Sequence, residues 1–262
     1  MDLEYLNLIF FPIFTILILI SILGYGTLIN NITFKNKIEL DLKNIIFIQG
    51  LIFTGFFFII LNFFIALSNY VSIILILGGS FIYIFYFFKN NKIRHELIFI
   101  LFVLLLSIIY SFYSGFNDDF NYHYETIKNY KDKNLFEILH HRRISYNSHW
   151  LFLNSIYTLS FFSSTLLILS SLFYSISIYD FTNFSRTMIQ KNKYFLTIIS
   201  FFCLIFFLGI LTKLKDLGTD IPGVIVSIYI IILITNKIFE KSNDKINNIF
   251  LITLLFCQFA II

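Results

Sequence analysis

Residues able to do chemistry gather between Gly115 and Trp150. This segment reads GFNDDFNYHYETIKNYKDKNLFEILHHRRISYNSHW, with four of the five His, five of the fifteen acidic and five of the nineteen basic residues. Long apolar runs flank it on both sides. Connections between helices are usually short, so one of this length needs a structure or a function of its own. We therefore place the candidate site in loop 116–148.

The first candidates are two adjacent carboxylates, Asp118 and Asp119, which directly follow an apolar run. Neighbouring side chains diverge in regular structure, so one can face a cavity as a general base while the other caps the next helix. The spacing alone leaves an alternative open, in which both are capping or solvated loop residues. We take the two as candidate catalytic residues.

Arg142 and Arg143 add a second kind of chemistry, because a planar guanidinium suits a phosphate or diphosphate held at a membrane surface. Contact with lipid headgroups is the alternative. The loop also holds four histidines, but no HExxH or HxH pairing accompanies them, so we predict no metal site. A divalent cation stays open as a cofactor. The four are His123, His140, His141 and His149.

The rest of the chain predicts a membrane setting for this loop. The sequence is 58% hydrophobic and 13% charged, with a mean hydropathy of +0.84, which is typical of a polytopic membrane protein. We expect an all-α transmembrane helix bundle of about seven to eight spans, forming one domain over 1–262, and the N-terminal part of a longer chain. The predicted spans are 6–29, 45–67, 70–88, 97–115, 149–178, 194–212 and 221–235, plus a fragment at 249–262.

The distribution of Lys and Arg predicts the orientation. Four connections each hold three basic residues, which makes them the expected cytoplasmic loops: 30–44, 89–96, 180–193 and 236–247. The remaining seven basic residues lie on the opposite side, which also receives the N-terminus and loop 116–148. We expect a multi-pass protein of a bacterial cytoplasmic membrane with the candidate loop outside. No basic run points to nucleic acid.

Helical periodicity predicts an amphipathic helix inside the loop. Phe120, Tyr124 and Ile127 recur on one face, and Asp119, His123 and Thr126 line the adjacent face. We expect the apolar face to rest on the membrane or on neighbouring spans and the Asp and His face to point toward a cavity. A second short helix is predicted at 135–139.

These motifs together resemble the polytopic GT-C glycosyltransferases, and more narrowly a group of bacterial GT-C-like proteins of surface-polysaccharide biosynthesis. The resemblance covers about residues 105–225. It rests on Asp-Asp after a span, Tyr122-His123 on a following helix, and Asn147-Ser148-His149-Trp150 entering the next span. A second outer motif, 215–222, resembles the second acidic loop of that superfamily, where Asp220 matches; a loop turn and helix cap is the alternative. Here three predicted spans precede the fourth, whereas the large acidic loop of GT-C enzymes usually follows the first helix.

The resemblance implies transfer of a sugar from a polyprenyl phosphate or diphosphate to a glycan or lipid acceptor on the outer side. Asp118 or Asp119 acts as the general base, and cations near the leaving phosphate stabilise its charge, with inversion at the sugar. Membrane lipids surround the protein, and no nucleic acid partner is implied. The implied substrate-binding residues are Tyr122, His123, His140, Arg142, Arg143, Asn147 and Asp220, with Lys213 and Lys215 as further phosphate contacts.

Three other functions remain open at this stage. A lipid-linked oligosaccharide flippase or a solute transporter predicts charged residues inside the spans, whereas all nineteen Lys and Arg fall in predicted connections. An O-antigen-polymerase-like enzyme would depend on Arg and His more than on paired carboxylates. An assembly subunit would have no chemistry of its own.

Overall fold

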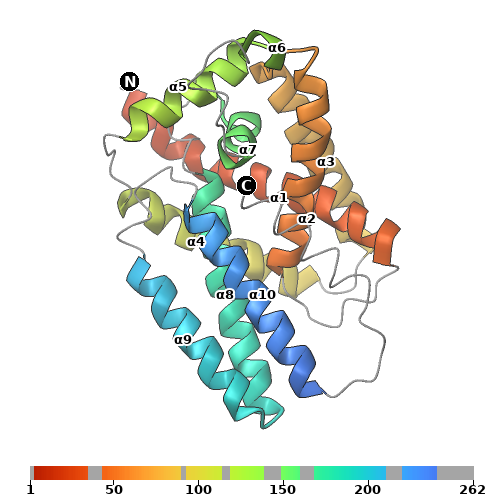
Figure 1. Ribbon diagram of the computed structural model, residues 1–262, viewed down its shortest axis with the longest axis vertical. Coiled ribbons are helices and arrows are strands. Elements are labelled where there is room, and N and C mark those ends of the chain that lie inside the picture. The colour runs from red at the N-terminus through yellow and green to blue at the C-terminus, as the bar shows by residue number, and fades with distance from the viewer. Residues whose placement is uncertain are drawn as a thin grey trace.

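The computed structural model describes residues 3–34, 43–89, 93–113, 119–138, 149–159, 168–210 and 220–240, and every regular element in these ranges is a helix. Figure 1 shows α8, α9 and α10 side by side in its lower half and α5 and α6 at its top. The predicted all-α class is confirmed for this part of the chain. The helices are α1 (Leu3–Phe34), α2 (Lys43–Asn62), α3 (Asn69–Lys89), α4 (Ile93–Tyr113), α5 (Asp119–Asp132), α6 (Leu135–Ile138), α7 (His149–Tyr157), α8 (Ile168–Gln190), α9 (Tyr194–Ile210) and α10 (Asp220–Glu240).

Small residues let α1 approach α2 and α3 closely. A Cβ placed on Gly24 would overlap the backbone carbonyl of Gly79 in α3, and one on Gly50 in α2 would overlap the carbonyl of Ile22. Apolar helices in a membrane gain little from hydrophobic burial, so close backbone approach at glycine is a main source of their association. The Tyr25 hydroxyl also donates to the Leu75 carbonyl at 3.0 Å. These contacts join the first three helices into one unit.

Three helices of the described residues are long and apolar enough to cross a membrane. They are Phe10–Ile32 within α1, Lys43–Asn62, which is all of α2, and Asn69–Phe88 within α3. Shorter apolar stretches occupy Tyr194–Gly209 in α9 and Gly223–Ile232 in α10. The helices of the chain are therefore consistent with a membrane protein, and the number of spans stays a prediction.

The predicted single span over 149–178 is wrong, because two separate helices occupy this region. α7 ends at Tyr157, Thr158 and Leu159 are not helical, and α8 begins at Ile168. At 1.5 Å per residue the nine residues of α7 extend only about 14 Å, too short for a span. Its side chains are buried from Trp150 onward. Hydropathy does not reveal the break after α7, because a short buried helix and a membrane span have the same apolar composition.

The predicted loop 180–193 is also much shorter than expected, since α8 continues through Asp180 to Gln190. The turn into α9 is closed by Asn192, which has a φ of 55°. The Lys193 amide donates to the Met188 carbonyl at 2.9 Å, and the Asn192 amide donates to the Ile189 carbonyl at 3.0 Å. A left-handed residue after the last turn, with these two bonds, is a standard way to end a helix. α8 and α9 therefore form a tight antiparallel hairpin.

Candidate functional site

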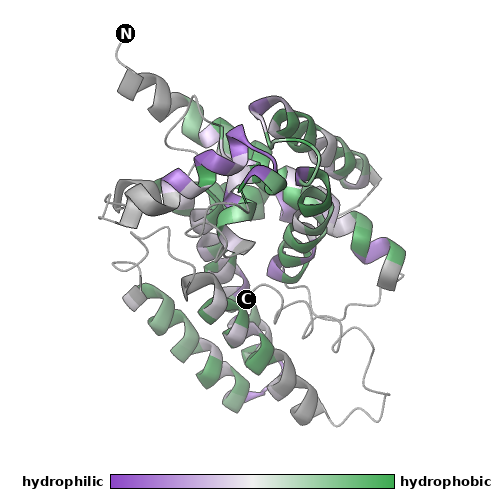
Figure 2. Cartoon of the chain, turned by 45° about the horizontal axis from the view of Figure 1, so that its top comes forward, coloured by the Kyte–Doolittle hydropathy of each residue, from purple (hydrophilic) through white to green (hydrophobic). Residues whose placement is uncertain are grey.

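The two helices of the long loop pack against the connection between α2 and α3. The Leu67 amide donates to the Tyr130 carbonyl of α5 at 3.1 Å, and the rings of Phe63 and Phe136 meet edge to face with centroids 5.3 Å apart. The Tyr130 ring meets Phe152 of α7 in the same way at 5.2 Å. Figure 2 shows hydrophilic residues gathered on α5, in contrast to the mostly hydrophobic α9. The predicted helices of the loop are confirmed, and they form a fixed layer over α7 and the α2–α3 connection.

The buried face of α5 differs from the one predicted. Thr126 and Ile127 are both buried, whereas Tyr124 is exposed. The prediction that Thr126 lies on the polar face with Asp119 and His123 is therefore wrong, since Thr126 is buried next to Ile127. That Tyr124 rests on the membrane stays a prediction. Docking onto α7 sets the buried face, and it adds Tyr130 and Lys131 at the end of the helix. Contacts between helices override the periodicity of so short a segment.

α6 begins with a side-chain cap that fixes where the loop turns. The Glu137 amide donates to Asn134 Oδ1 at 3.0 Å, and Asn134 Nδ2 donates to Glu137 Oε1 at 3.0 Å. Asn before a helix satisfies one of the amides that have no partner in the first turn. The Glu137 carboxylate in turn holds the side-chain amide of Asn134 in place. α6 is thus positioned by this local cap and by the contact of Phe136 with Phe63.

The side chains of the predicted site residues lie outside the described residues. Asp119, Tyr122 and His123 belong to α5, whose first residue is Asp119, and Asp220 is the first residue of α10. Asp118 directly precedes α5 in the sequence, where a capping residue stands. Their role as a site stays a prediction. The others outside the described residues are His140, Arg142, Arg143 and Asn147, together with the phosphate candidates Lys213 and Lys215.

Lys131 is a titratable group that sequence reasoning missed. Its side chain is only 6% exposed, and its amine donates to the hydroxyl of Ser72 in the first turn of α3. Burial lowers the pKa of the Lys131 amine to about 7, because a charged amine loses its hydration. Among the described residues the ion pair that the structure shows joins Lys43 to Glu96, and Lys131 is not part of it. The α5–α3 contact therefore holds a buried amine whose pKa lies well below that of an exposed lysine.

We expect Lys131 to make the stability of the fold depend on pH. Its folded pKa lies below the usual 10.5, so the unfolded state binds more protons between about pH 7 and pH 10.5. Wild-type stability should therefore rise with pH across that window. Lys131→Met removes the amine, and with it this rise, and should be at least as stable as wild type at pH 6. The measurement is the thermal unfolding midpoint in detergent from pH 6 to 10, followed by the fluorescence of Trp150, the single tryptophan.

Lys128→Met is the matched control, because Lys128 is exposed on the same helix. It should keep the pH dependence of the wild type. If the unfolding midpoints of wild type and Lys131→Met change with pH in parallel over the whole range, burial does not lower the pKa of the Lys131 amine. That result would contradict the prediction.

A second polar cluster surrounds Asp180 in the body of α8. Its carboxylate is buried and accepts the backbone amides of Lys43 at 2.9 Å and of Asn44 at 2.8 Å. The Tyr229 hydroxyl of α10 donates to the same carboxylate at 3.1 Å. The first amides of a helix lack partners and carry a partial positive charge, so a carboxylate there is stabilised. Asp180 thus caps α2 from another helix and ties α2, α8 and α10 together.

An ion pair extends this cluster toward α3 and α4. The Lys43 amine pairs with the carboxylate of Glu96, and both side chains are about 14% exposed. The Tyr83 hydroxyl donates to Glu96 Oε2 at 2.9 Å. The Lys43 amine also lies 5.6 Å from the centroid of the Phe99 ring, within cation–π range. The predicted cytoplasmic ends of α2, α3 and α4 are thereby joined at one place.

Each missed group left a partial signal in the sequence. Lys131 follows Ile127 by four residues, so it continues the buried face of α5. Asp180 follows a long apolar run, and treating that run as one span places Asp180 in a connection. Only the break after α7 moves Asp180 into the middle of a helix. In the described residues no three His, Cys, Asp or Glu side chains group together as metal ligands.

Comparison with known proteins gives a family for the chain without an activity. No curated protein and no solved structure matches it significantly. A family model described as a domain of unknown function, DUF8201, matches residues 8–262. Since this match takes in nearly the whole sequence, from the first helix onward, the chain belongs to the DUF8201 family.

Proposed function

We propose that this protein is a GT-C-like glycosyltransferase. It moves a sugar from a polyprenyl-phosphate-linked donor to a glycan or lipid acceptor on the extracytoplasmic side of a bacterial cytoplasmic membrane, during synthesis of a surface polysaccharide or glycoconjugate. The observation that carries the proposal is the docking of α5 and α6 on α7 and the α2–α3 connection. This docking holds the helices that follow the two acidic residues against the rest of the fold. Helices long enough to cross a membrane lie beside them.

This arrangement suits a reaction between a membrane-bound donor and a polar acceptor. A site on helices keeps a more constant geometry than one on free loops. Asp119 is the first residue of α5, and Asp118 precedes it in the sequence. A carboxylate there removes the proton of the acceptor hydroxyl as that oxygen attacks the anomeric carbon. The departing phosphate carries negative charge, which nearby Arg and Lys side chains stabilise.

The test is incorporation of labelled sugar in membranes that contain the full-length native protein. A panel of polyprenyl-phosphate-linked radiolabelled sugars is supplied to these membranes and to matched membranes without the protein. We expect transfer from at least one donor into material that is retained after extraction of the donor lipid, and only where the protein is present. Absence of transfer from every donor by the wild-type protein would argue against a glycosyltransferase.

Asp180 supports transport as a second candidate function. Ionisable residues in the body of membrane helices mark ion or substrate pathways in many transporters. The prediction that Asp180 lies in connection 180–193 does not hold, because Asp180 is buried in the body of α8. The hydrogen bonds that Asp180 accepts from the first amides of α2 give a structural reason for burying this carboxylate. The glycosyltransferase therefore remains the first proposal.

A further inference from the structure

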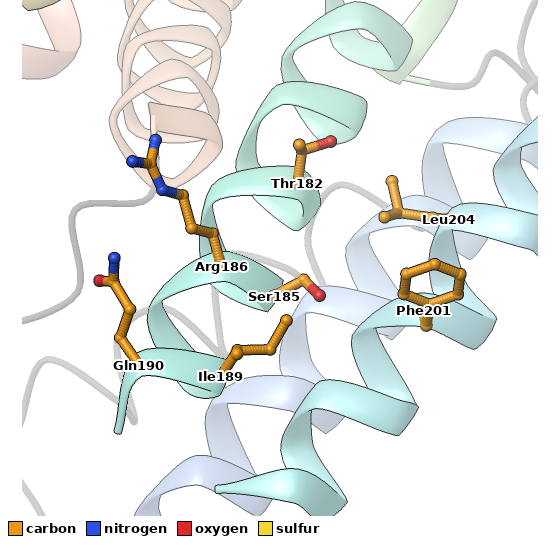
Figure 3. Close-up of a pocket in the computed structure, with 7 residues that line it drawn as sticks. All are labelled: Thr182, Ser185, Arg186, Ile189, Gln190, Phe201 and Leu204. Atoms are coloured by element: carbon orange, nitrogen blue, oxygen red, sulfur yellow. The ribbon is translucent and has the colours of Figure 1, made fainter. Parts of the chain in front are cut away.

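A groove of about 400 Å³ opens between α8 and α9, near the turn that joins them. Figure 3 shows Ser185 and Ile189 of α8 pointing toward Phe201 and Leu204 of α9, while Arg186 and Gln190 extend together from another side of α8. The groove thus has an apolar wall and a polar edge with one positive charge. It lies on a different part of the fold from the acidic loop.

The apolar wall continues the outer surface of α9. Ile198, Phe202 and Ile205 are each more than half exposed, and so is Phe201 in the groove itself. On a helix long enough to cover most of a bilayer core, such a row of exposed apolar side chains faces lipid chains. An acyl chain can therefore enter the groove from the bilayer without crossing water.

The polar edge is complementary to an anion. The sequence from Phe181 to Lys215 contains no Asp or Glu, and Lys191 and Lys193 follow Arg186 at the same end of α8. Arg186 is exposed, and the ion pair in the described part of the chain does not involve it. A guanidinium binds a phosphate through two parallel hydrogen bonds, and the Gln190 amide one turn later can donate a third. Basic pockets between helices on the cytoplasmic side commonly bind lipid headgroups.

We propose that this groove binds one anionic phospholipid, with its phosphate at Arg186 and Gln190 and an acyl chain over Ile189, Phe201 and Leu204. The charge selects an anionic headgroup, and the apolar wall selects a lipid over a free anion. The groove lies near the turn between α8 and α9, which is on the predicted cytoplasmic side. The lipid therefore comes from the inner leaflet. The site is independent of the glycosyltransferase proposal.

Native mass spectrometry of the purified, delipidated protein tests the proposal. The probes are phosphatidylglycerol, phosphatidylcholine, diacylglycerol and inorganic phosphate, each added alone. We expect one tightly bound phosphatidylglycerol and weaker binding of the other three. Arg186→Gln should reduce phosphatidylglycerol affinity about tenfold, the effect of losing one charged hydrogen-bonding partner.

Two variants make the result specific. Arg94→Gln removes an exposed arginine at the start of α4 and should leave the affinity unchanged. Leu204→Asn alters the wall without changing charge and should weaken phosphatidylglycerol but not inorganic phosphate. Equal binding of phosphatidylglycerol by wild type and Arg186→Gln would overturn the proposal, and so would phosphatidylcholine binding as tight as phosphatidylglycerol or phosphate binding as tight as lipid. Variants are compared only after Trp150 fluorescence shows the same unfolding midpoint as the wild type.

Discussion

Replacing Asp118 or Asp119 with Asn is expected to slow sugar transfer by about 10²- to 10⁴-fold in one of the two variants, the usual contribution of a positioned general base. Asn has nearly the shape of Asp but cannot accept the proton of the acceptor hydroxyl. The measurement is the initial rate of labelled sugar transfer from the donor that the wild type uses, at matched protein levels. The variant that loses activity identifies which of the two carboxylates is the base.

The choice of Asn separates catalysis from helix capping. Asn and Asp are about equally good at a helix N-cap, so a residue that only caps α5 loses little when it becomes Asn. Asp132→Asn is the matched control, since Asp132 is exposed at the other end of α5 and the charge change is the same. Its rate should equal that of the wild type. If both Asp118→Asn and Asp119→Asn transfer sugar at the wild-type rate, neither carboxylate is the base and the acidic loop has another role.

Much of the helical fold was predictable from the lengths of the apolar runs. The predicted spans 70–88 and 194–212 correspond closely to α3 (Asn69–Lys89) and α9 (Tyr194–Ile210). Lys89 ends the first run, and Lys193 and Lys213 bound the second. A charged side chain is costly in the bilayer core, so these residues limit where each helix can lie. Helix ends were less predictable. α8 continues to Gln190 through polar residues, because the left-handed Asn192 and its hydrogen bonds end the helix rather than a change in hydropathy.

The candidate site was predictable in its helices but not in its contacts. The sequence of the polar loop predicts the two helices α5 and α6. The hydrogen bonds between Asn134 and Glu137 mark the start of α6. Which face of α5 is buried depends on α7 and on the α2–α3 connection, which lie far away in the sequence. Lys131 could therefore be placed near a buried face but not beside Ser72. The polar cluster around Asp180 joins three helices, and no local sequence pattern predicts such a contact.

Asp180→Ala is expected to lower the free energy of unfolding by about 3 kcal/mol or more, because the buried amides of Lys43 and Asn44 and the hydroxyl of Tyr229 would lose their acceptor. Asp180→Asn keeps one acceptor oxygen and should lower it by less, about 1 kcal/mol. The measurement is titration of the purified protein from mild detergent into a denaturing one, followed by Trp150 fluorescence. Asp132→Ala, at an exposed position, should stay within about 0.5 kcal/mol of the wild type.

The order of these variants also decides between the two readings of Asp180. Stability that falls from wild type to Asn to Ala identifies the carboxylate as the tie between α2, α8 and α10, and a structural tie has no need to change its charge. A fold as stable with Ala as with Asp would mean that this carboxylate contributes nothing to capping α2. Its burial would then have no structural reason, and proton or ion transport would become the stronger explanation for a buried carboxylate in the body of α8.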